Sequence, residues 1–183
     1  MSSERKTGII RYDIEDGSIA SYAGVLLYRK VTPVFGTLSD DMDYIPGSSF
    51  LYEDYSSCLK PGDVFYEICL LKIFEENRRH GEGTKLVKRF FEQCKPQSVV
   101  LEAGITSEKL YNKLAAENKE FEYIEQNILP FWESLGFTDV NNTTFCFENH
   151  IPMLWPKEKV EEVRNKAEEF ERKLRGTETD FFS

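Results

Sequence analysis

The chain has 183 residues, a formal net charge of -9 at pH 7, 40% hydrophobic and 30% charged residues, a composition typical of one soluble globular domain. The acidic excess argues against nonspecific binding to nucleic acid or to an anionic membrane, because the field of the whole molecule repels such partners. No apolar run approaches the ~20 residues of a membrane span, and the N-terminal residues lack the apolar core of a signal peptide. We therefore expect a cytoplasmic protein with neither nucleic acid nor membrane as a partner.

The first third of the chain predicts strands joined by turns. Apolar and polar residues alternate over residues 8–14 and 18–30, on either side of Glu15-Asp16-Gly17. Alternation around such a turn signal predicts a hairpin that reverses at this tripeptide. Residues 35–61 mix glycine, proline, serine and aspartate, which predicts a long loop with one short strand near residues 49–52.

A sharper pattern begins at residue 64 with the apolar run VFYEICLLKIF, which predicts a strand buried on both faces and central in a sheet. A polar turn that contains glycines follows over residues 75–83. Residues 84–94 place their apolar side chains on one helical face, and residues 98–103 predict a second short buried strand. The order strand, turn, helix, strand predicts a right-handed crossover unit, which binds ligands at the carboxyl end of its strands.

Beyond this unit the pattern is helical. Residues 107–126 predict a charged helix, and residues 127–135 predict another that ends at Gly136. A final strand or hairpin is expected over residues 137–147.

The domain organisation that follows is one α/β domain over residues 1–156, an amphipathic helix over 157–176 and a flexible tail over 177–183. Apolar residues recur at helical spacing among many Glu, Lys and Arg side chains in the terminal helix. This helix packs either on the sheet or on a second subunit, so a homodimer is one expectation.

The turn Arg78-Arg79-His80-Gly81-Glu82-Gly83 fits R-x-x-G-x-G and favours an anion. At a helix start several N–H groups lack partners and the helix dipole adds positive charge, while glycines let a phosphate approach. The two arginines add charge-assisted hydrogen bonds, so the turn suits a pyrophosphate without a metal. The alternative is a tight turn in which Gly81 only permits the required backbone conformation and binds no ligand. The turn is neither a P-loop nor a Rossmann fingerprint, because the GK[ST] ending and the first glycine are missing.

Together with the segment NILPFWESLGF, residues 127–137, this turn and its strand, turn, helix, strand context resemble the GNAT N-acetyltransferase superfamily over about residues 64–137. The turn is similar to motif A, which cradles the coenzyme A pyrophosphate, and the later segment is similar to motif B. The resemblance implies a GNAT-like α/β fold with a mixed, mostly antiparallel central sheet flanked by helices and an extra C-terminal helix. It also implies acetyl-CoA as co-substrate and no metal.

The resemblance further implies three groups of cofactor contacts: backbone groups at the end of the strand before the turn, the turn itself, and the motif B helix. The expected cofactor-binding residues are Leu71, Lys72, Ile73, Arg78, Arg79, His80, Gly81, Glu82, Gly83, Thr84, Asn127, Phe131 and Trp132.

Acetyl transfer to an amine needs a neutral amine and a proton for the departing thiolate. Glu67 is similar to the glutamate that acts as general base in several family members; the alternative is a salt-bridged structural glutamate. Trp132 stands where many members have the tyrosine that protonates the thiolate, and an indole has no titratable hydroxyl. Tyr111, Tyr123 or water supplies the proton, or the thiolate leaves unaided, and Tyr123 joins Glu67 as a candidate catalytic residue. A second base candidate, His80, is expected to point outward or to touch phosphate.

An acidic run, Asp40-Asp41-Met42-Asp43 next to Tyr44, together with Glu53 and Asp54, lines an acceptor pocket for a cationic amine or is simply a solvated loop. The four cysteines form no CxxC pair and none is paired with a histidine near the motifs. They are expected to be buried side chains, and a covalent acetyl-enzyme has no support from the sequence.

The expected function is transfer of the acetyl group of acetyl-CoA to a primary amine by direct attack. The alternative is a coenzyme A-binding module that has lost catalysis and acts through protein contacts. A longer acyl donor is a third option. The acceptor stays open among small polyamines, aminoglycosides, amino acids and protein amines.

Overall fold

The computed structural model describes residues 6–37, 55–56, 58–140 and 150–181. Several features expected from the sequence lie outside these ranges: the short strand at residues 49–52, the acidic run with Tyr44, Glu53 and Asp54, most of the strand at 137–147, and Cys146.

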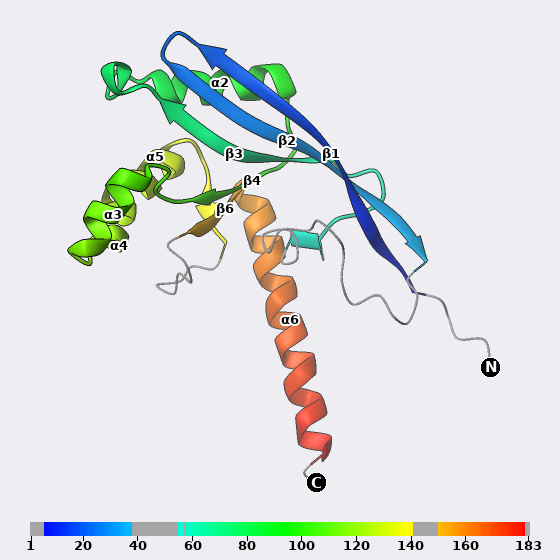
Figure 1. Cartoon of the computed structure of the whole chain (residues 1–183). Helices are drawn as coiled ribbons and strands as arrows, with labels where there is room; N and C mark the ends of the chain where they lie inside the picture. The colour runs from blue at the N-terminus through cyan, green and yellow to red at the C-terminus, as the bar shows by residue number, and fades with distance from the viewer. Residues whose placement is uncertain (1–5, 38–54, 57, 141–149, 182–183) are drawn as a thin grey trace.

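One mixed sheet of six strands, in the order β1-β2-β3-β4-β6-β5, organises the described residues (Figure 1). Only β3 and β4 pair in parallel, and the other neighbours are antiparallel. The strands are β1 Thr7–Ser21, β2 Gly24–Thr37, β3 Phe65–Ile73, β4 Val99–Ala103, β5 Thr138–Asp139 and β6 Ile151–Trp155. This mixed, mostly antiparallel sheet flanked by helices confirms the predicted fold class.

Helices connect and cover the strands. They are η1 Glu75–Asn77, α2 Glu82–Cys94, α3 Glu108–Ala116, α4 Glu120–Tyr123, the π-helical turn η2 Ile124–Ile128, α5 Leu129–Ser134 and α6 Lys157–Phe181. The crossover from β3 to β4 runs through α2, as the sequence predicts. Figure 1 shows α6 leaving the sheet and running away from it.

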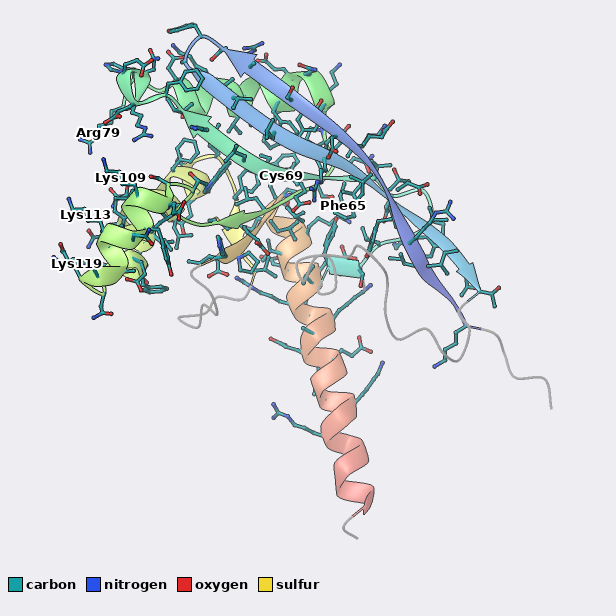
Figure 2. The ribbon with its side chains drawn as sticks, viewed as in Figure 1. Phe65, Cys69, Arg79, Lys109, Lys113 and Lys119 are labelled. Atoms are coloured by element: carbon teal, nitrogen blue, oxygen red, sulfur yellow. The ribbon has the colours of Figure 1, made fainter. Side chains whose placement is uncertain are left out.

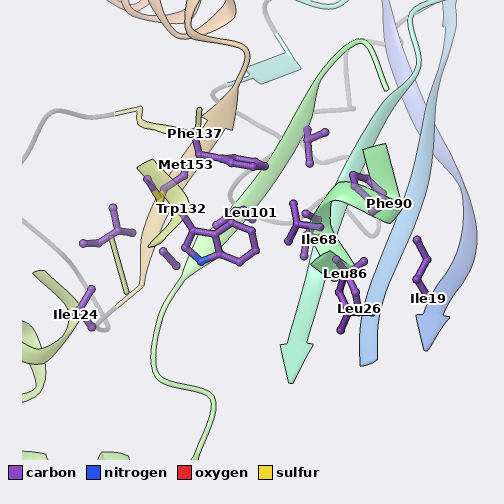
Figure 3. Packing of buried hydrophobic residues seen from close by; sticks show 14 residues of the cluster. Ile19, Leu26, Ile68, Leu86, Phe90, Leu101, Ile124, Trp132, Phe137 and Met153 are labelled. Atoms are coloured by element: carbon purple, nitrogen blue, oxygen red, sulfur yellow. The ribbon is translucent and has the colours of Figure 1, made fainter. Parts of the chain in front are cut away.

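Two hydrophobic clusters lie on opposite faces of the sheet, because successive side chains of a strand alternate between faces. The first joins α2 to the sheet and includes Leu26, Ile68, Leu86, Phe90 and Leu101 (Figure 3). The second joins the start of α6 to the other face and includes Val31, Phe65, Val100, Val160 and Val163. Strand β4 shows this alternation: Val100 belongs to the second cluster, and its neighbours Val99 and Leu101 belong to the first.

The predicted hairpin is present, but the prediction of its turn is wrong. The chain reverses at Tyr22 and Ala23, and the ladder runs through Asp16 and Gly17. Gly17 faces Tyr28 across the ladder, and a Cβ atom at Gly17 would lie 2.3 Å from the Tyr28 ring. This glycine makes room for a cross-strand aromatic ring, which the alternation pattern alone does not reveal.

Three other predicted elements need correction, and one strand was missed. In β3 only Phe65 and Ile68 are buried, because the carboxyl half of the strand borders cavities. The helix expected over 107–126 breaks at Asn118, whose φ of 53° is left-handed, and α4, η2 and α5 then run on without interruption. Strand β6 was not predicted. Helix α6 continues to Phe181, through most of the expected tail.

Candidate functional site

The parallel strands β3 and β4 pair only at their beginnings. Their register pairs are Tyr66 with Val99, Glu67 with Val100 and Ile68 with Leu101. Beyond Ile68 strand β3 continues to Ile73 with β2 as its partner, and β4 pairs with β6. A gap therefore opens between β3 and β4 at their carboxyl ends, which is where α/β units bind ligands.

A β-bulge lies at the start of this gap. Leu27 of β2 pairs with Leu70, and its neighbour Tyr28 pairs with Ile68, so Cys69 is an extra residue without a partner in the register. An extra residue bends its strand and increases the local twist. The bulge therefore bends β3 at the point where its pairing with β4 ends.

Two residues of β3 direct their backbone groups into the gap. The N–H of Phe74 donates to the carbonyl oxygen of Ala23 at 2.8 Å, and in an antiparallel pair such bonding alternates along the strand. Leu71 and Ile73 therefore point their N–H and C=O groups away from β2, whereas Lys72 points its own toward β2. In agreement, the Ile73 oxygen accepts a hydrogen bond from Arg78 Nε at 3.1 Å.

A cavity of about 300 Å³, which we call the groove, occupies this gap. It is bounded by the end of β3, by the connection from β4 to α3, and by one side of the α4–α5 run. Of the residues expected from the sequence, those that line it are Leu71, Lys72, Ile73, Arg78, Tyr123, Asn127, Phe131 and Trp132.

A second cavity, of about 310 Å³, lies at the turn before α2. It shares Leu71, Ile73, Arg78 and Phe131 with the groove, so the two are continuous. Its other expected lining residues are Arg79, Gly81, Glu82, Gly83 and Thr84. The structure thus brings the strand end, the turn and the segment of residues 127–132 around one continuous space. His80 is exposed and lines neither cavity.

The start of α2 is open. Its N-cap residue, Gly81, has a left-handed φ of 77°, no side chain caps the helix, and the N–H of Lys85 makes a helical bond to the Gly81 oxygen at 3.1 Å. The N–H groups of residues 82–84, in the first turn of α2, therefore have no helical partner and are available to a ligand. A Cβ atom at Gly83 would lie 3.3 Å from the Phe131 ring. Glycine at this position lets α5 contact the turn closely.

Two arginine side chains lie at the rim of this turn. Arg78 and Arg79 are exposed, and Arg79 extends out of the turn, away from the sheet (Figure 2). The nearby carboxylate of Glu82 accepts a hydrogen bond from Lys85 Nζ at 2.7 Å and another from the Tyr22 hydroxyl at 3.4 Å. The hydrogen bond from Lys85 lowers the pKa of Glu82. Lys85 thus offsets the one negative side chain that lines this cavity.

The far wall of the groove comes from the α4–α5 run. Tyr123, Asn127 and Phe131, four residues apart, all line it, and the π-helical turn lies between the first and the last. The Asn127 amide nitrogen donates to the Tyr123 carbonyl oxygen at 3.1 Å. Trp132 is 7% exposed and packs edge-on against Phe131 and Phe137. Its indole therefore belongs mainly to the core.

Glu67 lies behind the groove, not in it. It lines a third cavity of about 180 Å³, which we call the rear cavity, formed by Arg29, Glu67, Ile68, Cys69, Glu102, Gly104, Thr106 and His150. Ile68, Cys69 and Glu102 also line the groove, so the two cavities meet at the bulge. The Glu67 side chain is 14% exposed, and its Oε2 lies 3.8 Å from Arg29 Nη1. Glu67 thus has an ion-pair partner and also faces a cavity, and its role as a general base stays a prediction.

The rear cavity is on the sheet face opposite α2. Glu67 pairs with Val100 in the ladder, and side chains of a register pair point to the same face. Val100 belongs to the second cluster. Glu102, two residues further along β4, follows Val100 on this face. One molecule in the groove and another in the rear cavity would therefore approach each other from opposite sides of the gap.

Sequence reasoning missed Cys69, Glu102, Thr106 and His150. They come from strand ends and connections that are far apart in the sequence. Among them, only Glu102 had a local signal, because it is the one charged residue of the buried strand β4. Cys69 and His150 line the same cavity, an arrangement that can activate a cysteine as a nucleophile. However, burial raises the pKa of the Cys69 thiol to about 11. The thiol is protonated near neutral pH and is a poor nucleophile.

Comparison with known proteins gives only distant similarities. No family model and no curated protein matches the sequence. A solved structure of a bacterial toxin is similar with a TM-score of 0.40 and 16% identity, over 80% of this chain and 64% of the other. The structure of histone acetyltransferase HPA2 and related acetyltransferase from Corynebacterium glutamicum is similar with a TM-score of 0.34 and 14% identity, over 74% and 65%.

The chain spans less than two thirds of the length of either of these proteins. At these TM-scores and identities, neither similarity bears on what this chain does. Among the described residues, no group of three His, Cys, Asp or Glu side chains is arranged to hold a metal ion. None of the described helices combines the length and apolar character that a membrane span needs.

Proposed function

We propose that this protein transfers an acetyl group from acetyl-CoA to a primary amine. One observation carries the proposal: the unpaired edge of β3 beyond Ile68 leads directly to the open start of α2. A pantetheine arm has two amides, which hydrogen-bond to an exposed strand edge as another strand would. A pyrophosphate suits the N–H groups and positive dipole of a helix start. A strand edge followed by an anion site matches the order of these groups in coenzyme A.

The residues that would hold the coenzyme follow from this match. Leu71 and Ile73 present backbone groups to the pantetheine amides. The N–H groups of residues 82–84, with Arg78 and Arg79, bind the phosphates. Phe131 packs against the arm where the groove and the turn cavity meet. When bound, acetyl-CoA supplies the thioester that reacts.

The chemistry is a direct transfer. The nitrogen of a neutral amine forms a bond to the thioester carbonyl carbon, the carbon–sulfur bond breaks, and its electron pair leaves with the coenzyme A sulfur. The proton of the amine passes to a base at the rear cavity, Glu67 or His150. Tyr123, which lines the groove, or water returns a proton to the thiolate. Holding both reactants at the gap contributes most of the rate enhancement, through proximity and orientation.

Binding is tested by Gly81→Glu. The new carboxylate would occupy the phosphate position, so we expect loss of acetyl-CoA binding in calorimetry. Because the left-handed φ of Gly81 disfavours most residues, the matched control is Gly81→Asn, which tolerates this conformation and adds no charge. Retained binding in the glutamate variant, or equal loss in both variants, would contradict a phosphate site at the turn.

Catalysis is tested by Glu67→Gln. If Glu67 accepts the proton, turnover falls about 10²–10⁴-fold, while acetyl-CoA affinity is unchanged. The assay is coenzyme A release over a panel of amines. A pH–rate profile like that of the wild type would assign the base elsewhere, with His150→Gln as the next variant. Acetyl-CoA binding without release for every amine would favour the noncatalytic module.

A further inference from the structure

A row of charged side chains crosses the sheet on the face opposite α2. The ladder pairs Asp16 with Arg29 and Arg29 with Glu67. Arg29 Nε lies 3.3 Å from Asp16 Oδ1, and Arg29 Nη1 lies 3.8 Å from Glu67 Oε2. Glu102 follows on β4 and lines the same cavity as Arg29 and Glu67. The row contains three carboxylates and one guanidinium, so the local electrostatic potential favours a cation.

The protein places its own cation beside Glu67. The distance of 3.8 Å exceeds the ~2.7–2.9 Å of a close charge-assisted hydrogen bond, and the Arg29 side chain is 46% exposed. Because this contact is longer than a close hydrogen bond, a cation that comes nearer to the Glu67 carboxylate can compete with Arg29 for it. An incoming ammonium group can therefore take the place of the guanidinium, which Asp16 continues to hold.

The size of the rear cavity limits the ligand. Its volume of about 180 Å³ is below the roughly 300–1,000 Å³ of sites for drug-sized ligands. An amine of a few heavy atoms fits within this volume. The cavity presents two carboxylates, Glu67 from β3 and Glu102 from β4, and it meets the groove at the bulge.

From these features we infer that the rear cavity binds a small diamine as the acetyl acceptor. One nitrogen reaches the gap, the other remains an ammonium group, and the two carboxylates face the two nitrogens. Arg29 is the internal cation that the ligand replaces. The inference rests on the proposed function for the transfer step, but the binding of the diamine is a property of the cavity itself.

The first test compares three amines of equal chain length: diaminobutane, butylamine and aminobutyrate. We expect kcat/KM for diaminobutane to exceed that for butylamine by about tenfold, with aminobutyrate the poorest substrate because its carboxylate meets two others. Equal values for the diamine and the monoamine, or a preference for aminobutyrate, overturn the inference.

The second test uses variants of the charged row. Glu102→Gln should raise KM for diaminobutane toward the value for butylamine, so that the preference for the diamine is lost. Arg29→Gln should lower KM for diaminobutane, because the competing cation is gone. The matched control is Glu92→Gln, an exposed residue of α2 that lines none of the three cavities. A Glu102 variant that behaves like the control contradicts the inference.

Direct calorimetry separates this inference from the proposed function. Diaminobutane is titrated into the protein without coenzyme, and the wild type should bind it more tightly than butylamine, with the difference lost in Glu102→Gln. This result supports the cation site even if no acetyl transfer is found. Tight acetyl-CoA binding with no difference between the two amines would leave the proposed function intact and reject the diamine.

Discussion

Cys69 shows how the surroundings of one residue set its chemistry. It is the bulge residue of β3, it lines both the groove and the rear cavity, and its free thiol belongs to a residue that is exposed as a whole, although the sulfur is partly desolvated. Burial raises the pKa of this thiol to about 11, and the neighbouring Glu67 carboxylate adds to the increase. A cysteine beside a histidine would otherwise suggest an acetyl-cysteine intermediate. For the proposed reaction, the protonated thiol favours direct attack by the amine instead.

Alkylation kinetics test this property. Because the thiolate is the reactive form, the rate of Cys69 modification by iodoacetamide should rise about tenfold per pH unit from pH 7 and keep rising beyond about pH 9. A pKa raised by burial places the plateau near pH 11. Mass spectrometry of the Cys69 peptide gives the rate, with glutathione as the reference thiol. A plateau near pH 8.5, the ordinary value, would contradict the raised pKa of the Cys69 thiol.

The pairing of β2 with β3 depends on a close approach at one glycine. A Cβ atom at Gly24 would lie 2.2 Å from the Lys72 carbonyl oxygen, a backbone atom that has little freedom to move. Gly24 is paired with Ile73, one of the two residues that present backbone groups to the gap. The shape of the groove therefore depends on this contact between two strands.

We expect Gly24→Ala to lower the free energy of unfolding by about 1–3 kcal/mol, as overpacking does, and to weaken acetyl-CoA binding as well. Urea unfolding and calorimetry measure the two effects. Gly176→Ala is the control, because a Cβ atom there meets no atom within 4 Å and alanine favours a helix. A Gly24 variant as stable as the control would show that the strands separate easily.

Across the whole molecule, the two clusters hold helices to opposite faces of the sheet. α6 contributes Val160 and Val163 to the second cluster, and the Arg164 guanidinium donates to the carbonyl oxygens of Asp139 and Val140. Beyond Lys166, every side chain of α6 that the structure describes is exposed. The first turns of α6 therefore belong to the domain, and its later part adds little to it.

Shortening the chain after Lys166 should leave the urea midpoint and acetyl-CoA binding unchanged. In contrast, Val160→Ala should lower the free energy of unfolding by about 2 kcal/mol, because it removes buried methyl groups and leaves a cavity. A large loss of stability in the shortened chain would show that the distal part of α6 packs against a second copy. Sedimentation of both proteins distinguishes that outcome from simple unfolding.

Local patterns in the chain predicted much of the fold. The crossover unit from β3 through α2 to β4 and the glycine turn follow from periodicity and from residues adjacent in sequence, because such elements depend on near neighbours. Most expected cofactor residues then appear around one continuous space, although their roles stay predictions. The predicted position of the hairpin turn was wrong because Gly17 makes room for the Tyr28 ring on the opposite strand. The local pattern does not show this partner.

The gap and the rear cavity depend on contacts between distant parts of the chain. Pairing of β3 with β4 ends at Ile68, the bulge lies at Cys69, and Glu102 and His150 reach the rear cavity from other strands. The register of a sheet, and the face to which each side chain points, depend on pairing between residues that are tens of positions apart in the sequence. A one-residue shift in register moves every side chain of the strand to the other face. The amino-acid pattern therefore predicts a glycine turn at a helix start in a mixed α/β domain, whereas tertiary packing decides the gap and the rear cavity beside that turn.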